Sequence, residues 1–206
     1  MRKNPQGLEA QKVRKNRDIL HNEALKWLKK AATATYNGKT GYPESLFYLA
    51  DCYGNGNLGL TIDHERAFGY YSQGCKHDHP SCIYRTGVCY EVGAGPKRDY
   101  NRAVQYYRKA ALLGDTAAMF KMGMILLEGS LGQGKRPKEG VNLLKRAAAQ
   151  ADEATPYALH ELAILYEGSA FDPSTGIVPV SIWLCKKTYF IRILPMLLSY
   201  ISRVLN

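Results

Sequence analysis

The sequence predicts an all-α solenoid of two-helix repeats, because two patterns recur along it at a nearly constant spacing. Ser45, Cys82, Ala118 and Ala158 begin four similar segments, so the copies lie 37, 36 and 40 residues apart. Periods of this size are typical of helical repeat proteins. A second pattern lies between the first, so each unit holds two helices, here named A and B. The A segments are 44–56, 81–93, 117–129 and 157–169, and the B segments are 24–32, 67–75, 103–111 and 140–148.

The B segments come first along the chain, which begins with a B helix, 24–32, that has no A helix before it. In the copy at 103–111, Ala103, Tyr106, Tyr107 and Ala110 fall on one face of a 3.6-residue period. Small residues let neighbouring helices approach closely, and tyrosines fill the remaining volume. Charged runs that precede the later B segments mark the loops before them.

The A segments show the same periodicity. Apolar or small residues stand one, four, five and eight positions after the small first residue, which is one helical face. We therefore expect this face to form the core of each repeat. A glycine ends each of the first three A segments and suits a left-handed helix C-cap. The face positions of the second copy are Ile83, Thr86, Gly87 and Tyr90, and the glycines are Gly56, Gly93 and Gly129.

Composition and charge limit the classes of partner. The 206 residues carry a formal net charge of +10, with a pI of about 9.3. The basic residues are spread over repeat loops and outer helix faces, and no nucleic-acid motif accompanies them, so we expect no nucleic-acid binding. An acidic protein surface or anionic lipid headgroups fit the charge better. Residues 1–20 form a polar, basic segment without the apolar run of a signal peptide, which predicts a cytoplasmic protein.

No constellation of catalytic residues is found, and we expect no enzyme activity and no cofactor. The glycine-rich stretches 54–59 and 129–135 follow helices and lack the spacing of a phosphate-binding loop. His77 and His79 could in principle bind a metal ion, but two histidines in a turn without further ligands more often belong to a surface loop. We therefore predict no metal site.

The cysteines are expected to be thiols. Cys52 and Cys89 stand where other repeats carry Ile125 and Leu165, so they are predicted to be small buried hydrophobic residues. Cys75 ends one B helix and Cys82 begins the next A helix. The equivalent pair one repeat later is two alanines, so this junction does not need a disulfide.

A candidate binding surface lies on the A helices. The positions two, six and nine after the small residue form a stripe that faces away from the core of each repeat, and stacked A helices line the concave side of solenoids. Part of this stripe, including Val88, Met124 and Ile164, is expected to pack on neighbouring A helices. The aromatic residues at the second position and charged neighbours are the predicted partner-binding residues. They are Phe47, Asp51, Tyr84, Arg85, Phe120, Lys121 and His160.

The segment TGVCYEVGAGPKRDYNRAVQYYRKAALLGD, residues 86–115, resembles the Sel-one-like repeat (SLR) family almost position by position. The resemblance extends from about residue 24 to residue 169 and implies a right-handed, TPR-like superhelix. Segments 43–63, 113–137 and 143–168 closely resemble fungal activators of chitin synthase, also known as chitin synthase regulatory factors. That likeness implies a non-catalytic scaffold that binds and activates or localises a membrane chitin synthase in cell-wall and septum synthesis. Septum or bud-neck scaffold proteins would be further partners, and the location would be peripheral at the plasma membrane or septum.

Two other functions remain open from the family resemblance. One is an adaptor in a protein quality-control or signalling complex. The other is a hydrolase of the secreted, cysteine-rich branch, whose members staple the junction occupied here by Cys75 and Cys82 with a disulfide.

The predicted organisation has three parts: a basic segment at 1–20, the solenoid at 21–169 and an atypical tail at 170–206. The tail contains Pro173, Pro179 and Pro195 and lacks the small residues of a B helix, so we expect it to be mobile or loosely docked. Relatives continue with further repeats and often a prenylated cysteine. This tail has neither, so we expect a truncated or aberrant end.

Overall fold

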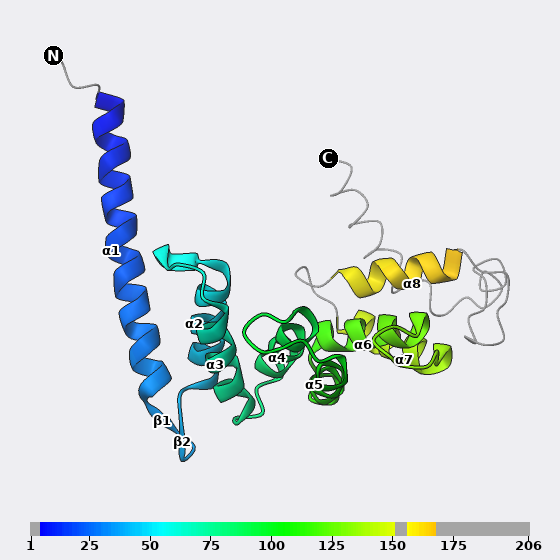
Figure 1. Ribbon diagram of the computed structural model, residues 1–206. Coiled ribbons are helices and arrows are strands. Elements are labelled where there is room, and N and C mark those ends of the chain that lie inside the picture. Colours follow the sequence, from blue (N-terminus) through cyan, green and yellow to red (C-terminus); the bar gives the residue numbers. More distant parts are fainter. Residues whose placement is uncertain (1–4, 151–155, 168–206) are drawn as a thin grey trace. The chain divides into compact units, whose positions relative to one another are not determined.

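The structure is a computed structural model that describes residues 5–150 and 156–167 (Figure 1). It divides into two compact units, Met1–Asp115 and Thr116–Asn206, which are treated separately below. The tail 170–206 and Cys185 lie outside the described residues, as do Ser169 and residues 1–4. The helices of the first unit are α1 (Pro5–Thr33), α2 (Pro43–Asn55), α3 (His64–Cys75), α4 (Pro80–Val92) and α5 (Tyr100–Leu112). Those of the second are α6 (Thr116–Glu128), α7 (Pro137–Ala149) and α8 (Tyr157–Glu167).

The predicted all-α fold of two-helix repeats is confirmed. Each A helix packs against the B helix that follows it, as α2 on α3, α4 on α5 and α6 on α7. B helices also contact the next A helix, as α1 on α2, α3 on α4 and α7 on α8. Two short elements were not expected: an antiparallel hairpin of β1 (Thr35–Tyr36) and β2 (Lys39–Thr40), and a 3₁₀ turn, η1 (Asn57–Gly59).

The predicted glycine caps are present at the ends of the first three A helices. Gly56, Gly93 and Gly129 have φ angles of 71°, 84° and 75°, in the left-handed region that favours glycine. Each donates its backbone N–H to the carbonyl oxygen four residues earlier, on Cys52, Cys89 and Ile125 respectively. The caps satisfy carbonyls at the helix ends, and the chain then turns toward the next B helix.

The core of each repeat follows the predicted face. Leu46, Leu49, Ile83, Met119 and Met122 are almost completely buried. The residue five positions after the small first residue is small because the B helix lies directly over it. A Cβ atom on Gly87 would lie 2.7 Å from Tyr107 Cε1, and one on Gly123 would lie 2.9 Å from Leu144 Cγ. In the first two complete repeats, the residue eight positions after the small first residue is a tyrosine that stacks on the B helix. Tyr53 stacks on Tyr70, and Tyr90 stacks on Tyr106.

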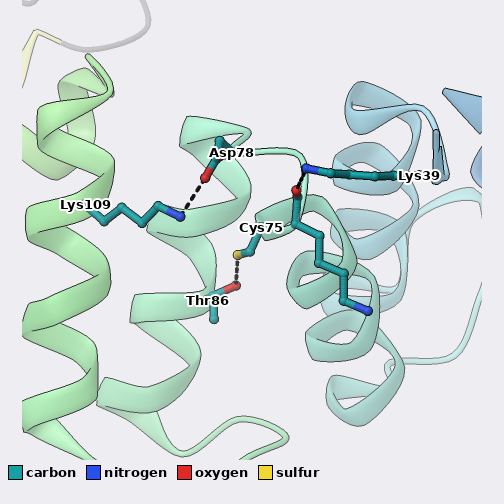
Figure 2. A network of polar contacts seen from close by, with 6 residues as sticks. Lys39, Cys75, Asp78, Thr86 and Lys109 are labelled. Atoms are coloured by element: carbon teal, nitrogen blue, oxygen red, sulfur yellow. Dashed lines mark hydrogen bonds and ion pairs between the residues drawn. The ribbon is translucent and has the colours of Figure 1, made fainter. Parts of the chain in front are cut away.

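The turn between α3 and α4 makes polar contacts with α5 on one side and with the hairpin on the other (Figure 2). Lys109 Nζ on α5 lies 2.6 Å from Asp78 Oδ1, and Lys39 Nζ of the hairpin donates to the carbonyl oxygen of Lys76. Beneath the turn, Cys75 Sγ lies 3.2 Å from Thr86 Oγ1, which donates to the Cys82 carbonyl. The turn therefore holds the first two complete repeats in a fixed register.

The histidines of this turn have structural partners. His77 Nε2 lies 3.1 Å from the carbonyl oxygen of Thr40, and His79 Nδ1 caps α4 by accepting the backbone N–H of Cys82. Burial lowers the pKa of His79 below its ordinary value, which keeps the imidazole neutral and able to accept. Among the described residues, no three His, Cys, Asp or Glu side chains gather closely enough to hold a metal ion.

The cysteines of the described residues are free thiols. Cys52 and Cys89 are buried, which confirms the prediction that they act as small hydrophobic residues. Cys82 is completely buried against α3, where a Cβ atom on Gly74 would lie 2.3 Å from its sulfur atom. Burial also raises the pKa of the Cys75 and Cys82 thiols, so both stay protonated at neutral pH.

Candidate protein-interaction face

The first unit presents one side of α2 and α4 away from its core. Side chains that are exposed or partly exposed stand three, six and ten positions after the small first residue, roughly opposite the buried face. We name this set the outer ridge. It consists of Tyr48, Asp51 and Asn55 on α2, with Arg85, Val88 and Val92 on α4.

Charged members of the outer ridge join its two helices. Arg85 Nη2 lies 3.8 Å from Asp51 Oδ1, which also accepts an N–H from Asn55 Nδ2 at 2.9 Å. Both charged side chains keep contact with water, so this ion pair stabilises the fold by about 1 kcal/mol or less. A partner can therefore replace it with its own charges at small cost. Asp51 and Arg85 were both predicted as partner-binding residues, and the structure brings them together.

The predicted aromatic residues Phe47 and Tyr84 flank the ridge and are half-buried. Phe47 packs at one edge of the core, with its ring centroid 6.0 Å from that of Tyr71 and 5.8 Å from that of His79. Tyr84 lies 5.7 Å from the buried ring of Tyr107, and burial raises the pKa of its hydroxyl. Each ring thus packs against the core and is partly exposed.

Two exposed apolar residues of the ridge were not predicted. Tyr48 and Val92 are each 59% exposed, more than Phe47 or Tyr84. The signal was available in the sequence, since both stand on the side of helix A opposite the core positions. The only ring contact that either makes among the described residues is an edge-on contact of Tyr48 with Phe47, at 5.7 Å between ring centroids. With Tyr48 at one end and Val92 at the other, the ridge offers apolar contact around a central ion pair.

The second unit carries the remaining predicted residues on α6 and α8. Phe120 is half-buried, with its ring centroid 6.2 Å from that of Tyr157, and Lys121 beside it is also half-buried. His160 is exposed on α8. Ile164, one turn later, is 47% exposed, so the expectation that it packs on a neighbouring A helix was wrong. The structure therefore brings Phe47, Asp51, Tyr84 and Arg85 to one face of the first unit, and Phe120, Lys121 and His160 to the second.

Basic loops adjoin the A helices in both units. Lys97 and Arg98 are exposed before α5, where Arg98 Nη2 donates to the carbonyl oxygen of Val92 at 3.4 Å. Lys135 and Arg136 are exposed before α7, and Arg136 Nη1 lies 3.0 Å from Glu139 Oε2. No helix among the described residues is both long and apolar enough to cross a bilayer.

Comparison with known proteins agrees with this architecture. Residues 11–36, 43–79, 80–115 and 116–152 match the Sel1 repeat family. Among solved structures, one similar protein is a Sel1 repeat protein from Oxalobacter formigenes. The alignment spans 64% of this chain and 53% of the Oxalobacter protein, at a TM-score of 0.56 and 27% identity. A second solved structure is the protective antigen c5321 of uropathogenic Escherichia coli, which displays an SLR fold. The alignment spans 69% of this chain and 28% of the antigen, at a TM-score of 0.59 and 24% identity.

Curated relatives are named as regulators. The chain is 36% identical over 150 residues to chitin synthase regulatory factor 3 of Schizosaccharomyces pombe, and 33% identical over 136 residues to regulatory factor 2 of the same yeast. It is 34% identical over 153 residues to the chitin synthase regulator SKT5 of Saccharomyces cerevisiae. These matches cover 66% to 73% of this chain, but only 16%, 27% and 21% of the three relatives, in the order given.

Proposed function

Because the chain belongs to the Sel1 repeat family, we propose that it is a non-catalytic scaffold that binds a membrane chitin synthase and activates or localises it. The observation that carries this proposal is the likeness to three proteins named as chitin synthase regulators, at 33% to 36% identity across the repeats. The chain spans about a quarter or less of these relatives, so the proposal concerns what the repeat region itself does.

The outer ridge and the flanking rings supply a suitable surface. Large aromatic side chains are frequent anchors of protein interfaces, and Tyr48, Phe47 and Tyr84 lie at or beside the ridge. A synthase segment bound there would cover the apolar residues and exchange charges with Asp51 and Arg85. In the second unit, Phe120, Lys121 and His160 would bind in the same way.

The basic loops would direct the encounter. Lys97, Arg98, Lys135 and Arg136 are exposed next to the A helices, and positive charge attracts acidic protein segments and anionic lipid headgroups. We place the protein in the cytoplasm, at the plasma membrane or septum where its partner is embedded. Septum or bud-neck scaffold proteins are further partners in this proposal.

A reconstitution tests the proposal. The purified chain is added to membranes from a fungal strain that has a chitin synthase but lacks its own synthase regulators. Co-sedimentation and the rate of chitin synthesis are measured against membranes without the synthase. The proposal predicts synthase-dependent binding and a faster rate, or, for a purely localising role, synthase-dependent binding alone. Equal binding to both membranes would contradict it.

One observation favours a second candidate, an adaptor in a signalling complex. The chain is 27% identical over 184 residues to the activator of C kinase protein 1 of Saccharomyces cerevisiae, which covers 81% of this chain. The same reconstitution separates the two functions, since a signalling adaptor would bind equally to membranes with and without the synthase.

A further inference from the structure

Helix α1 is a B helix whose face for an A helix is not covered by any of the described residues. Its residues Ala24, Leu28 and Ala31 align with Ala103, Tyr107 and Ala110 of α5, which the A helix α4 covers completely. In α1, Ala24 is exposed, while Leu28 and Ala31 are only partly buried. Trp27 aligns with Tyr106, which stacks on Tyr90 of α4, yet the Trp27 side chain is 59% exposed. The same face of the fold is thus built in α1, and within residues 5–150 no helix covers it as α4 covers α5.

The usual connection cannot supply that partner. In the complete repeats, seven or eight residues of loop join helix A to helix B, as between α4 and α5. The residues of α1 that align with this loop are 13–20, and they are helical, because α1 runs without a break from Pro5 to Thr33. An A helix joined through a loop of the usual length is therefore excluded, and the covering helix must come from elsewhere.

The uncovered face continues along the helical extension. Val13 and Leu20 precede Trp27 at intervals of seven residues and are 67% and 68% exposed. Residues seven apart lie nearly above one another on a helix, so they form one narrow stripe. We name Val13, Leu20, Ala24 and Trp27 the α1 seam. Ala31 continues the same stripe by one turn beyond Trp27, so from Val13 to Ala31 the stripe is about 27 Å long at 1.5 Å per residue, which is enough for a partner helix of about 18 residues.

The charge around the seam identifies the kind of helix that fits. Residues 10–33 contain seven Lys or Arg and two Asp or Glu, a net charge of +5. A second copy of α1 would bring the same charge to the interface and be repelled, whereas acidic side chains on both flanks would be attracted.

A lipid surface fits the helix less well. The basic residues Lys12, Arg14, Lys15 and Arg17 point in four different directions at about 100° per residue. A helix that lies on a membrane instead gathers its charges on one polar face.

We propose that the α1 seam is a docking site for an amphipathic helix of another protein, with small or aliphatic residues along its contact stripe and acidic residues on its flanks. The bound helix takes the place that an A helix has in the complete repeats. This site is separate from the outer ridge of α2 and α4, so it gives the scaffold a second partner.

A synthetic peptide tests the site. The probe is an 18-residue fluorescein-labelled helix with alanine and leucine at every third and fourth position and glutamate on both flanks. Its anisotropy is measured against the full-length chain carrying Trp183→Phe, so that Trp27 emission gives an independent signal. We expect saturable binding with a blue shift of Trp27, and weaker binding at high salt.

Two variants of neighbouring exposed residues provide the control. Leu20→Lys places a charge in the seam and is expected to weaken peptide binding about tenfold or more, as loss of an interface anchor does. Ile19→Lys adds the same charge about 100° around the helix and should change the affinity less than about twofold. Both side chains are exposed, so neither change should unfold the protein.

Other outcomes overturn the proposal. These are an equal effect of Leu20→Lys and Ile19→Lys, absence of binding, or equal affinity for a peptide with lysine in place of glutamate. Dimerisation of the chain through α1, seen by light scattering and abolished by Leu20→Lys, would identify a second copy as the occupant and refute an acidic partner. A Trp27 shift with phosphatidylserine vesicles but not with the peptide would assign the face to lipid.

Discussion

At the scale of single residues, glycine and tyrosine form a matched pair between helices A and B. Gly87 is buried beneath Tyr107, which is itself completely buried and donates its hydroxyl hydrogen to Glu91. The tyrosine fills the volume that the missing Cβ of Gly87 leaves. In the next repeat the same position pairs Gly123 with Leu144. The size of one residue is thus set by the size of the other.

Gly87→Ala is predicted to destabilise the protein by about 1–3 kcal/mol, because the new methyl group would overlap Tyr107. Gly69→Ala is the control, since Gly69 lies within α3 with nothing within 4 Å of its Cβ position. It should be neutral or stabilise by up to about 1 kcal/mol, because alanine favours the helix. Urea unfolding of both variants measures this. Equal stability of the two would show that α4 and α5 are not in close contact.

The Cys89 thiol predicts a dependence of stability on pH. Burial raises the pKa of Cys89 from 9.0 to about 11, an effect that nearby Arg85 partly offsets. The folded state therefore keeps this proton where the unfolded state releases it. The stabilisation is fully present below pH 9 and is lost as the pH rises toward 11.

Cys89→Ala should remove that part of the pH dependence. Between pH 8 and pH 10.5, the free energy of unfolding of the unsubstituted protein should fall by about 2 kcal/mol more than that of the variant. Urea titrations at the two pH values measure the difference, and the comparison cancels the other titrating groups. Parallel pH profiles would show that Cys89 reaches water in the folded protein.

At the scale of helices, local signals were sufficient to predict most boundaries. The glycine caps, the small residues and the apolar periodicity predicted α2 to α8 to within a few residues, because each signal acts inside one repeat. The hairpin was missed although it has a local cause. Asn37 and Gly38 both have positive φ angles, as expected for Asn-Gly in a two-residue β-turn.

The extension of α1 to Pro5 was not predicted, because its apolar stripe recurs only every seventh residue, at Val13 and Leu20, and lacks the denser pattern of small and apolar residues that marks the other helices. Residues 10–20 of α1 are all exposed, so the repeat core does not specify them. The candidate face was predicted in part. Asp51 and Arg85 were chosen separately, and their pairing depends on how α2 and α4 are placed, which a pattern within one helix does not contain.

The side chain of Asp99 caps the N-terminus of α5. Asp99 accepts the backbone N–H of Arg102 at 3.0 Å, as Asp63 accepts that of Arg66 in the preceding repeat. Asp99→Ala should destabilise the protein by about 1–2 kcal/mol, while Asp99→Ser, which can still cap, should lose much less. Thermal unfolding of both variants tests this. Equal losses would assign the effect to the exposed Asp99–Arg102 ion pair instead of the cap.

At the scale of the whole molecule, some aromatic residues build the repeats and others remain available to a partner. Tyr107 belongs to the first group and is completely buried. Tyr84 and Phe120 belong to the second, since each is half-buried and keeps part of its ring in contact with solvent. This division underlies the proposal that A helices of this scaffold bind a chitin synthase.

The most direct test compares the double variant Tyr84→Ala, Phe120→Ala with Tyr107→Ala, using melting temperature and synthase pull-down for each. The double variant should weaken binding by about 2 kcal/mol or more, as loss of interface anchors does, with a small fall in melting temperature. Tyr107→Ala should instead destabilise the fold by about 3–5 kcal/mol. Equal losses of stability would show that Tyr84 and Phe120 are core residues, and unchanged binding by a stable double variant would contradict the proposed interface.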